Sequence, residues 1–348
     1  MNAGTYNRRH IVAVAVAVAV AAAVATGTLS LSELASAQAP IIIKFSHVVA
    51  PDTPKGKGAE KFKELAEKRL AGKVKIEVYP NSQLYKDGEE MEALSLGSVQ
   101  MLAPSLAKFG PLGVREFEVF DLPYIFDNYE ELHKVTGGPA GQALLNKLQP
   151  KGITGLAYWD NGFKVLSANK PLKLPADVKG QKMRVQSSKV LESQMRALGA
   201  LPQTMAFSEV YQALQTGVVD GTENPPSNMF TQKMHEVQKH AIQTDHGYLG
   251  YAVIVNKKFW DGLPADVRSG LESAMKEATV YANTIAKQEN EQSLEKIKAS
   301  GKTAFYVPTA PERAAWKKAM VSVHKDMESR IGKETIQSVY KETGFTPD

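Results

Sequence analysis

The feature that most limits the possible folds is a stretch of 36 residues, 265–300, which contains no proline and only one glycine. Pro264 precedes it and Gly301 follows it, and these residue types favour the beginning and the end of a helix. Apolar residues from Leu271 to Ile297 recur at a roughly helical spacing. One continuous helix would be about 54 Å long, which exceeds a single domain of this chain. We expect one helix that lies across two lobes; the alternative is two helices separated near Asn290.

The patterns elsewhere indicate an α/β protein. Short β-branched runs alternate with amphipathic segments, which is the βαβ pattern of a parallel sheet, and this pattern occurs twice along the 348 residues. In open α/β sheets, ligands bind at the carboxyl ends of the strands. The expected strands are residues 41–45, 74–79, 99–103, 153–158, 182–185 and a short one that begins at Val218, and the expected helices are residues 59–70, 91–96, 187–198 and 208–216.

The N-terminus has the pattern of an export signal. Arg8 and Arg9 precede an apolar run, residues 11–25, which is too short to span a bilayer as a helix. The sequence Ala35-Ser36-Ala37 then fits a cleavage site. We expect residues 1–37 to be a cleaved signal peptide and the mature protein to lie in the periplasm; the alternative is an uncleaved anchor. The two arginines leave the twin-arginine route open beside general secretion.

No motif of a known catalytic centre is found. The chain has no H-E-x-x-H, no G-x-S-x-G and no phosphate loop, since residues 55–58 hold lysine and glycine at the wrong spacing. It also has no cysteine, which excludes a thiol nucleophile and cysteine-bound zinc. The net charge of +5 comes from basic residues that are mixed with acidic ones, so nucleic-acid binding is not expected. We expect neither an enzyme nor a cofactor.

From about residue 42 onward, the chain resembles the extracytoplasmic solute receptors of TRAP (tripartite ATP-independent periplasmic) transporters, in particular the DctP-type, C4-dicarboxylate-binding branch. The segments that carry the resemblance are residues 44–47 (KFSH), 79–84 (YPNSQL), 121–124 (DLPY), 182–185 (KMRV), 202–211 (PQTMAFSEVY) and 213–225 (ALQTGVVDGTENP). The resemblance implies a two-lobed periplasmic-binding-protein fold, with hinge strands, a cleft and a long helix that spans both lobes. It assigns residues 38–161 and about 250–289 to lobe I, and residues 162–249 and about 290–348 to lobe II.

The resemblance also implies the central ligand residues. The family's ligand-binding arginine corresponds to Arg184, whose guanidinium offers a planar fork of donors that matches a carboxylate. Asn224 corresponds to the asparagine that hydrogen-bonds the same carboxylate, and Phe207 to the aromatic residue that packs on the ligand carbons. The structural alternatives are a surface ion pair for Arg184, a turn residue for Asn224 and a core residue for Phe207.

Further site residues are expected at the other end of the ligand. Lys164 stands where some relatives have arginine, and it would serve a second acid group or a single carboxylate oxygen. His47 would donate to the distal carboxylate, and Ser105 replaces an acidic residue that meets ligand hydroxyls in sialic-acid binders. Trp159 and Tyr251 are weaker candidates for cleft walls. A solvated lysine and a structural histidine are the alternatives.

Together these residues predict a monomeric receptor for one small carboxylate, most simply a C4-dicarboxylate such as malate, succinate or fumarate. The partners would be the membrane subunits of a TRAP transporter. Within the same class, the ligand would instead be another organic acid, such as a 2-oxo acid or an aromatic acid. A receptor that presents the acid to a sensor kinase is a further alternative, and an enzyme ranks third.

Overall fold

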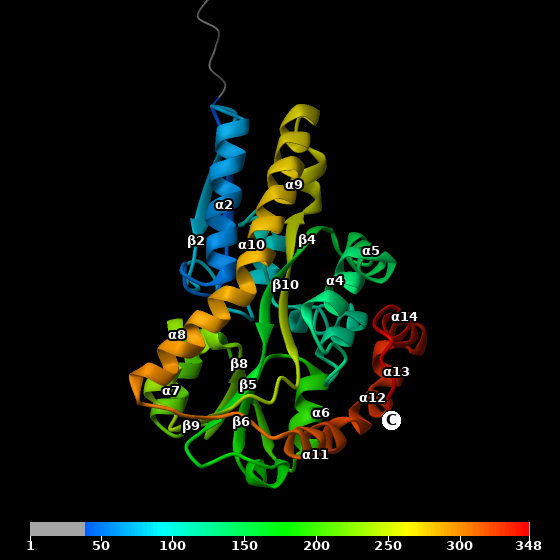
Figure 1. Ribbon diagram of the computed structural model, residues 1–348. Coiled ribbons are helices and arrows are strands. Elements are labelled where there is room, and N and C mark those ends of the chain that lie inside the picture. Colours follow the sequence, from blue (N-terminus) through cyan, green and yellow to red (C-terminus); the bar gives the residue numbers. More distant parts are fainter. Residues whose placement is uncertain (1–38, 348) are drawn as a thin grey trace, which may run out of the picture. The chain divides into compact units, whose positions relative to one another are not determined.

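Two β-sheets organise the part of the chain that the computed structural model describes, residues 39–347 (Figure 1). One sheet has five strands and the other has six. Helices pack against both sheets, which confirms the predicted α/β class. The predicted signal peptide, residues 1–37, lies outside the described residues.

The first sheet has a parallel and an antiparallel half. In spatial order its strands are β2 (Val74–Tyr79), β1 (Ile41–Ser46), β3 (Met101–Leu102), β10 (Tyr248–Asn256) and β4 (Ile153–Phe163). Strand β1 is parallel to β2 and β3, whereas β10 is antiparallel to both β3 and β4. The prediction of a parallel sheet is therefore wrong for this half. Strand β10 escaped prediction because all nine of its residues are buried, and a continuous apolar run has no period that identifies a strand.

The second sheet has six strands, and β6 is the second strand from one edge. In spatial order its strands are β11 (Ala304–Tyr306), β9 (His240–Ile242), β5 (Val165–Ala168), β8 (Gly221–Asn224), β6 (Lys182–Val185) and β7 (Leu201–Thr204). Strand β6 has the predicted bounds and is parallel to β7 and β8. The strand expected to begin at Val218 begins instead at Gly221, because Val218 lies in the preceding turn with 57% of its surface exposed.

Three chain segments connect the sheets: two short ones, and the long stretch from β10 to β11. Strand β4 of the first sheet ends at Phe163 and β5 of the second sheet begins at Val165. Lys164 is therefore the only residue between these two strands. The return segment, residues 243–247, connects β9 to β10. The backbone N–H of Lys164 donates to the carbonyl of Gly247 at 2.9 Å, which ties the two segments together where they cross.

The helices cover both sheets and show clear end signals. Helix α2 (Pro54–Arg69) begins earlier than predicted, because the Thr53 hydroxyl accepts from the N–H of Gly56 and Pro54 fits the first turn. The other helices of the first two-thirds are α3 (Glu90–Ser95), α4 (Tyr129–Gly137), α5 (Pro139–Asn146), α6 (Lys189–Ala197), α7 (Val210–Gln215) and α8 (Pro226–Thr231). Those that follow are α9 (Lys257–Asp261), α10 (Ala265–Ser300), α11 (Ala310–Met320), α12 (Ser322–Asp326), α13 (Glu328–Ile331) and α14 (Lys333–Thr343).

Helix α10 is continuous over 36 residues, so the predicted single helix is confirmed and a break near Asn290 is wrong. Its first half packs with α2 in the core cluster that contains Phe45, and Ile297 in its last turn belongs to a cluster of the second sheet. The side chain of Asn290 donates to the carbonyl of Asn161 at 2.7 Å and accepts from the N–H of Ser227 at 2.9 Å. In Figure 1 the orange half of α10 leans away from the line of its yellow half. None of the helices within residues 39–347 has the length and hydropathy of a membrane span.

The C-terminal helices return toward the first sheet. Trp316 of α11 packs in the same cluster as Met183 of β6. By contrast, Val323 of α12 and Ile336 of α14 pack in the cluster that contains Tyr158 of β4. The lobe boundaries stay a prediction. The prediction places all of residues 290–348 in lobe II, whereas α12 and α14 have their core contacts in the cluster that contains Tyr158 of the first sheet.

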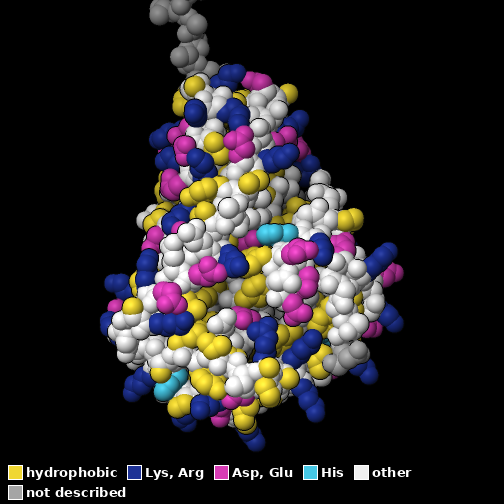
Figure 2. All heavy atoms as spheres, in the orientation of Figure 1, with side chains coloured by type: hydrophobic (Ala, Val, Ile, Leu, Met, Phe, Trp, Pro, Cys, Tyr) yellow, Lys and Arg dark blue, Asp and Glu magenta, His cyan; other side chains and the backbone are white. Residues whose placement is uncertain are grey.

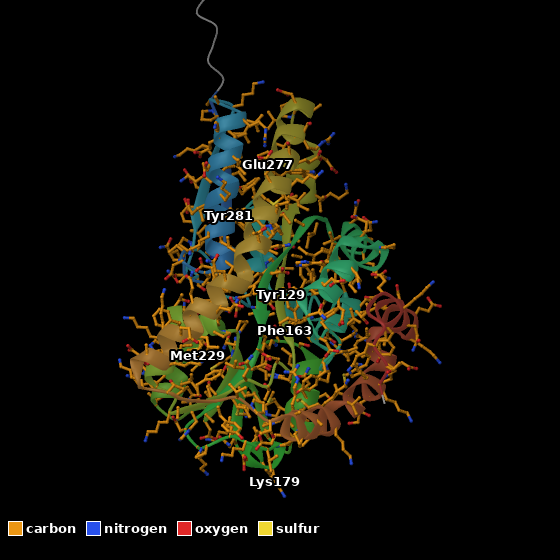
Figure 3. All side chains as sticks on the ribbon, viewed as in Figure 1. Tyr129, Phe163, Lys179, Met229, Glu277 and Tyr281 are labelled. Carbon is orange, nitrogen blue, oxygen red and sulfur yellow. The ribbon has the colours of Figure 1, made fainter. Side chains whose placement is uncertain are left out.

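Charges of both signs are interspersed on the surface. Figure 2 shows basic and acidic side chains mixed over the visible face. Many form pairs between elements, such as Lys57 with Glu289, Arg69 with Glu277 and Lys73 with Asp266, each at 2.6 Å. Figure 3 labels Glu277, which forms one of these pairs, and Tyr281, both on α10.

Candidate functional site

A cavity lies where strand ends of the two sheets meet. From the first sheet, it is lined by residues that follow β1 and β3, including Val48 and Ser105, and by Tyr251 of β10. From the second sheet, it is lined by Gln186, which follows β6, and by Asn224, the last residue of β8. These positions agree with the rule that α/β sheets bind ligands at the carboxyl ends of strands. The lining is completed by Val49, Lys55, Asp87, Phe207, Asn228 and Leu249.

Arg184 of β6, the strand next to the edge strand β7 of the second sheet, borders this cavity. Its side chain is 1% exposed, and its Nε and Nη2 atoms donate to the carbonyl of Met205 at 3.2 and 2.9 Å. The guanidinium carbon lies 5.8 Å from the ring centroid of Phe207, which lines the cavity. Among the described residues, Nη1 makes no hydrogen bond to a protein atom. The guanidinium therefore keeps donors for an additional acceptor.

An ion pair between Asp87 and Lys108 stands beside Arg184. Lys108 Nζ lies 2.6 Å from Asp87 Oδ1, and the N–H of Phe207 donates to Asp87 Oδ2 at 2.7 Å. Arg184 Nη2 is farther from the same carboxylate, at 3.9 Å. Burial would raise the pKa of Asp87, but Lys108 and Arg184 outweigh burial and hold it below its ordinary value. Asp87 is thus a charged carboxylate whose short-range partner is Lys108.

Three buried ionisable residues occupy the first-sheet side. Lys55 Nζ donates to the carbonyl of Ala103 at 2.9 Å and lies 3.8 Å from the ring centroid of Tyr251. Burial lowers the pKa of Lys55 to about 7 and raises the pKa of Glu90 to about 7. Burial and then the Lys55 charge lower the pKa of His47 to about 3, so its imidazole is neutral. Neither ring nitrogen of His47 has a hydrogen-bond partner among the described residues.

Amides and hydroxyls supply the polar rest of the site. Asn161 Nδ2 donates to Asn228 Oδ1 at 2.9 Å and to the Tyr251 hydroxyl at 2.7 Å. Asn224 Nδ2 makes two long contacts, with the Thr222 hydroxyl at 3.3 Å and with Met234 Sδ at 3.7 Å. Asn224 therefore holds a weak internal bond that a stronger acceptor in the cavity would replace.

Lys164 and Trp159 have partners elsewhere. Lys164 Nζ lies 2.8 Å from Glu223 Oε1, and His246 Nε2 lies 2.9 Å from Glu223 Oε2. Burial would raise the pKa of Glu223, but Lys164 and His246 lower it to about 2. Trp159 donates from Nε1 to the Thr279 hydroxyl at 2.9 Å and packs 5.9 Å from Phe45. Both lie outside the cavity lining, so their ligand roles stay predictions.

The structure thus gathers most of the predicted residues around one cavity. Asn224, Phe207, Ser105 and Tyr251 line it; Arg184 borders it through Phe207 and Asp87, and His47 adjoins the lining residue Val48. Lys55, Asp87 and Lys108 were missed. Asp87 lies in an irregular polar segment that has no period, and Lys55 lies in residues 55–58, whose spacing does not match a phosphate loop. The one available sequence signal is for Lys55. It lies in the first turn of a helix, where the helix dipole disfavours a cation, and this unusual position could have marked it as a candidate.

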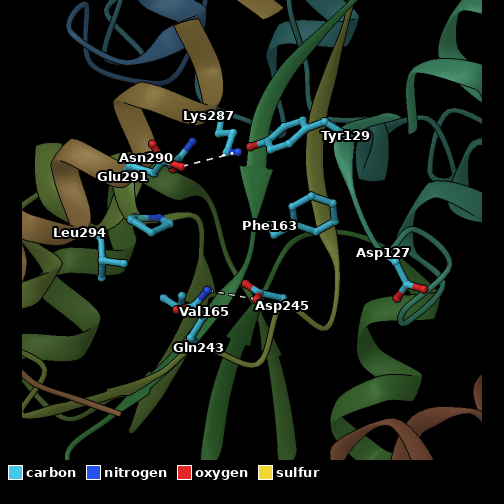
Figure 4. A pocket seen from close by; sticks show the side chains of 11 residues that line it. Asp127, Tyr129, Phe163, Val165, Gln243, Asp245, Lys287, Asn290, Glu291 and Leu294 are labelled. Atoms are coloured by element: carbon cyan, nitrogen blue, oxygen red, sulfur yellow. Dashed lines mark hydrogen bonds and ion pairs between the residues drawn. The ribbon is translucent and has the colours of Figure 1, made fainter. Parts of the chain in front are cut away.

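A second pocket lies beside α10, next to the two short segments that connect the sheets (Figure 4). Tyr129 and Phe163 form one wall, with ring centroids 5.2 Å apart, and Figure 3 shows the two side by side. Three of its charged groups form ion pairs, Lys287 with Glu291 at 3.8 Å and Asp245 with Arg313 at 3.1 Å. None of the predicted site residues lines this pocket.

Comparison with known proteins identifies the kind of receptor. The chain is 73% identical over 300 residues to the C4-dicarboxylate-binding periplasmic protein DctP of Rhodobacter capsulatus, covering 86% of this chain and 90% of that protein. A TRAP periplasmic solute-binding protein from Shewanella oneidensis, solved with bound succinate, has a TM-score of 0.86 and 44% identity over 88% of this chain and 100% of that one. The corresponding protein from Pseudomonas aeruginosa, solved with bound L-malate, has a TM-score of 0.81 and 46% identity over 82% of this chain and 100% of that one.

These similarities confirm the resemblance to the TRAP solute receptors and the two-lobed fold that it implies. The family model for bacterial extracellular solute-binding proteins, family 7, matches residues 45–330, which is most of the chain. The chain therefore belongs to family 7 of the bacterial extracellular solute-binding proteins.

Proposed function

We propose that this protein is a periplasmic receptor that binds a C4-dicarboxylate, such as succinate, fumarate or malate, and delivers it to the membrane subunits of a TRAP transporter. The similar proteins whose names specify C4-dicarboxylates, and the solved relatives that hold succinate or malate, support this ligand class. The export pattern of residues 1–37 supports a periplasmic location. The protein acts by binding and release, without catalysis.

The observation that carries the proposal is that the guanidinium of Arg184 keeps hydrogen-bond donors that no described protein atom uses. The group is buried, and one protein carbonyl occupies its Nε and Nη2 donors. A ligand carboxylate that meets the remaining donors forms charge-assisted bonds in a site with little water, where such bonds are strong. Asn224 would add a neutral donor to the same carboxylate, and Phe207 would cover the carbon chain.

The two-lobe arrangement supports a receptor that closes on its ligand. Arg184, Asn224 and Phe207 belong to the second sheet and the segments after its strands, whereas Ser105 and Tyr251 belong to the first. A ligand that touches both groups favours the form in which they are close, which is the requirement for a ligand-driven closure.

A thermal-shift screen against organic acids, followed by calorimetry, tests the ligand class. A ligand at 100 times its Kd stabilises a protein by about 2.7 kcal/mol, so succinate, fumarate and malate should each raise the melting temperature. If only 2-oxo acids or aromatic acids raise it, the C4-dicarboxylate assignment is wrong. A gene deletion that abolishes uptake of the same acid would support transport over presentation to a sensor kinase. The mass of the periplasmic protein would show whether residues 1–37 are removed.

A further inference from the structure

Lys55 differs from the other buried lysines among the described residues. These buried lysines are Lys55, Lys108 and Lys164. Lys108 lies 2.6 Å from Asp87 and Lys164 lies 2.8 Å from Glu223, so each has a carboxylate partner. Lys55 is 0% exposed and, within residues 39–347, forms no ion pair. A buried cation without a counter-ion is costly, so its position requires an explanation.

The neighbours of Lys55 do not supply that explanation. The ammonium has three donors, of which one meets the carbonyl of Ala103 at 2.9 Å, while the ring of Tyr251 lies 3.8 Å away. The nearby Glu90 has two carboxylate oxygens without any hydrogen-bond partner, so it does not pair with Lys55. Helix α2 does not stabilise the charge either, because the N-terminal end of a helix repels cations and the first turn of α2 has no acidic residue.

Lys55 lines the same cavity that Arg184 borders, and the two come from different sheets. Lys55 lies in the first turn of α2, which packs on the first sheet, and Arg184 belongs to β6 of the second sheet. Asp87 is near both groups, but Lys108 already neutralises it at 2.6 Å. The cavity therefore has two cations that no carboxylate fully pairs, one on each side. Lys55 has no ion pair among the described residues, and Arg184 is 3.9 Å from Asp87, which lies closer to Lys108. An anion with a single charge would leave one of them uncompensated.

We propose that Lys55 binds the second carboxylate of the ligand while Arg184 binds the first, so that Lys55 selects dicarboxylates over monocarboxylates. This inference rests on the proposed function. Lys55 then takes the place of Lys164 as the partner of the distal carboxylate, since Glu223 already compensates the charge of Lys164. His47 is a neutral neighbour whose ring, without a partner among the described residues, is free to donate a hydrogen bond. The Tyr251 ring and the Ala103 carbonyl then hold the Lys55 ammonium in place for the ligand.

The test combines a change in the ligand with a change in the residue. Succinamate has the length of succinate but replaces one carboxylate with a neutral amide. By calorimetry, wild-type protein should bind succinate about 100-fold more tightly than succinamate, since a buried charge pair of this kind contributes several kcal/mol. In Lys55→Gln the preference should fall below about threefold, mainly through loss of succinate affinity. Lys57→Gln, which changes a surface lysine two residues away, should keep the full preference.

The outcomes separate this inference from the proposed function. If wild-type protein binds no dicarboxylate, the proposed function fails and this inference fails with it. If succinate binds and Arg184→Ala abolishes binding, but Lys55→Gln keeps the wild-type preference, only the role of Lys55 is wrong. Lys55→Met repeats the test should Lys55→Gln not fold, because it removes the charge and fills the same space. Equal binding of succinate and succinamate by the wild-type protein would overturn the inference without any variant.

Discussion

The ammonium of Lys164 lies 2.8 Å from Oε1 of Glu223, and this pair links the residue that precedes β5 to β8 of the second sheet. Both side chains are buried, and His246 completes the group at 2.9 Å from Oε2. Lys164 is also the single residue between β4 and β5. The pair therefore stabilises the crossing between the sheets.

We expect Lys164→Met to lower the free energy of unfolding by about 3 kcal/mol, because it leaves the Glu223 carboxylate buried with His246 as its remaining partner. Lys55→Met is the matched control. It removes a buried lysine that has no ion pair, so the unliganded protein should be at least as stable as the wild type. Urea denaturation of both variants measures the difference, and equal effects of the two substitutions would contradict the assignment of the charges.

The same group predicts an acid dependence of stability. The pKa of Glu223 is lowered from 4.5 to about 2, because Lys164 and His246 outweigh burial. A carboxylate with a depressed pKa contributes stability that is present above its unfolded pKa and is lost as the pH falls through the folded value. Stability should therefore decline between about pH 4.5 and pH 2. Glu223→Gln should remove this part of the decline in a series of urea titrations, and an unchanged acid profile would argue against it.

Arg184 should be required for binding but not for folding. We expect Arg184→Ala to lose measurable succinate binding in calorimetry while keeping a cooperative melting transition, since the ligand carboxylate would lose its buried partner at a cost of roughly 3–5 kcal/mol. Arg184→Lys should keep only part of the affinity, because an ammonium lacks the planar fork. Wild-type affinity in Arg184→Ala would remove the central site assignment.

Binding of a dicarboxylate should be accompanied by proton uptake near pH 8. Burial lowers the pKa of Lys55 to about 7, so much of it is neutral at this pH, and a carboxylate placed beside it raises the pKa and draws in a proton. The other ionisable groups that face Lys55 are His47, Asp87, Glu90, Lys108 and Tyr251. Calorimetry in two buffers of different ionisation enthalpy measures the uptake. Lys55→Gln should lose most of it, and at pH 6 the wild type should take up little.

The parts of this structure that were predictable depend on local patterns. Helix α10 follows from apolar residues at helical spacing between clear ends, and β6 follows from the alternation of polar and apolar residues in Lys182–Val185. The segment around Arg184 is in addition a motif of the family that the chain resembles. Strand β10 was not predictable in this way, since a fully buried run lacks a period.

The charge partners were not predictable from the sequence, because they depend on tertiary contacts. Glu223 is 59 residues from Lys164, and Ala103 is 48 residues from Lys55. A lysine that pairs with a buried carboxylate and one that faces a cavity look alike in the sequence. Only the surrounding fold distinguishes the role of Lys55 from that of Lys164.

Ligand binding should make the protein more compact. Residues from both sheets line the cavity, so a ligand held by Arg184 on one side and Lys55 on the other binds more tightly when the sheets approach each other. Lys164 and Gly247 tie the crossing segments together, and α10 passes from one sheet to the other without a break. The motion would therefore be a rotation about these connections, with α10 bending around residues 283–290.

Small-angle scattering with and without succinate tests this motion, and the radius of gyration should decrease at saturating ligand. Arg184→Ala, which would not hold the ligand, should show no decrease under the same conditions. Succinamate should produce a smaller decrease than succinate in the wild type, because it engages Lys55 without a charge. A radius that stays constant while calorimetry shows full binding would mean that the sheets do not move. The membrane subunits would then have to recognise the loaded receptor by something other than its closed form.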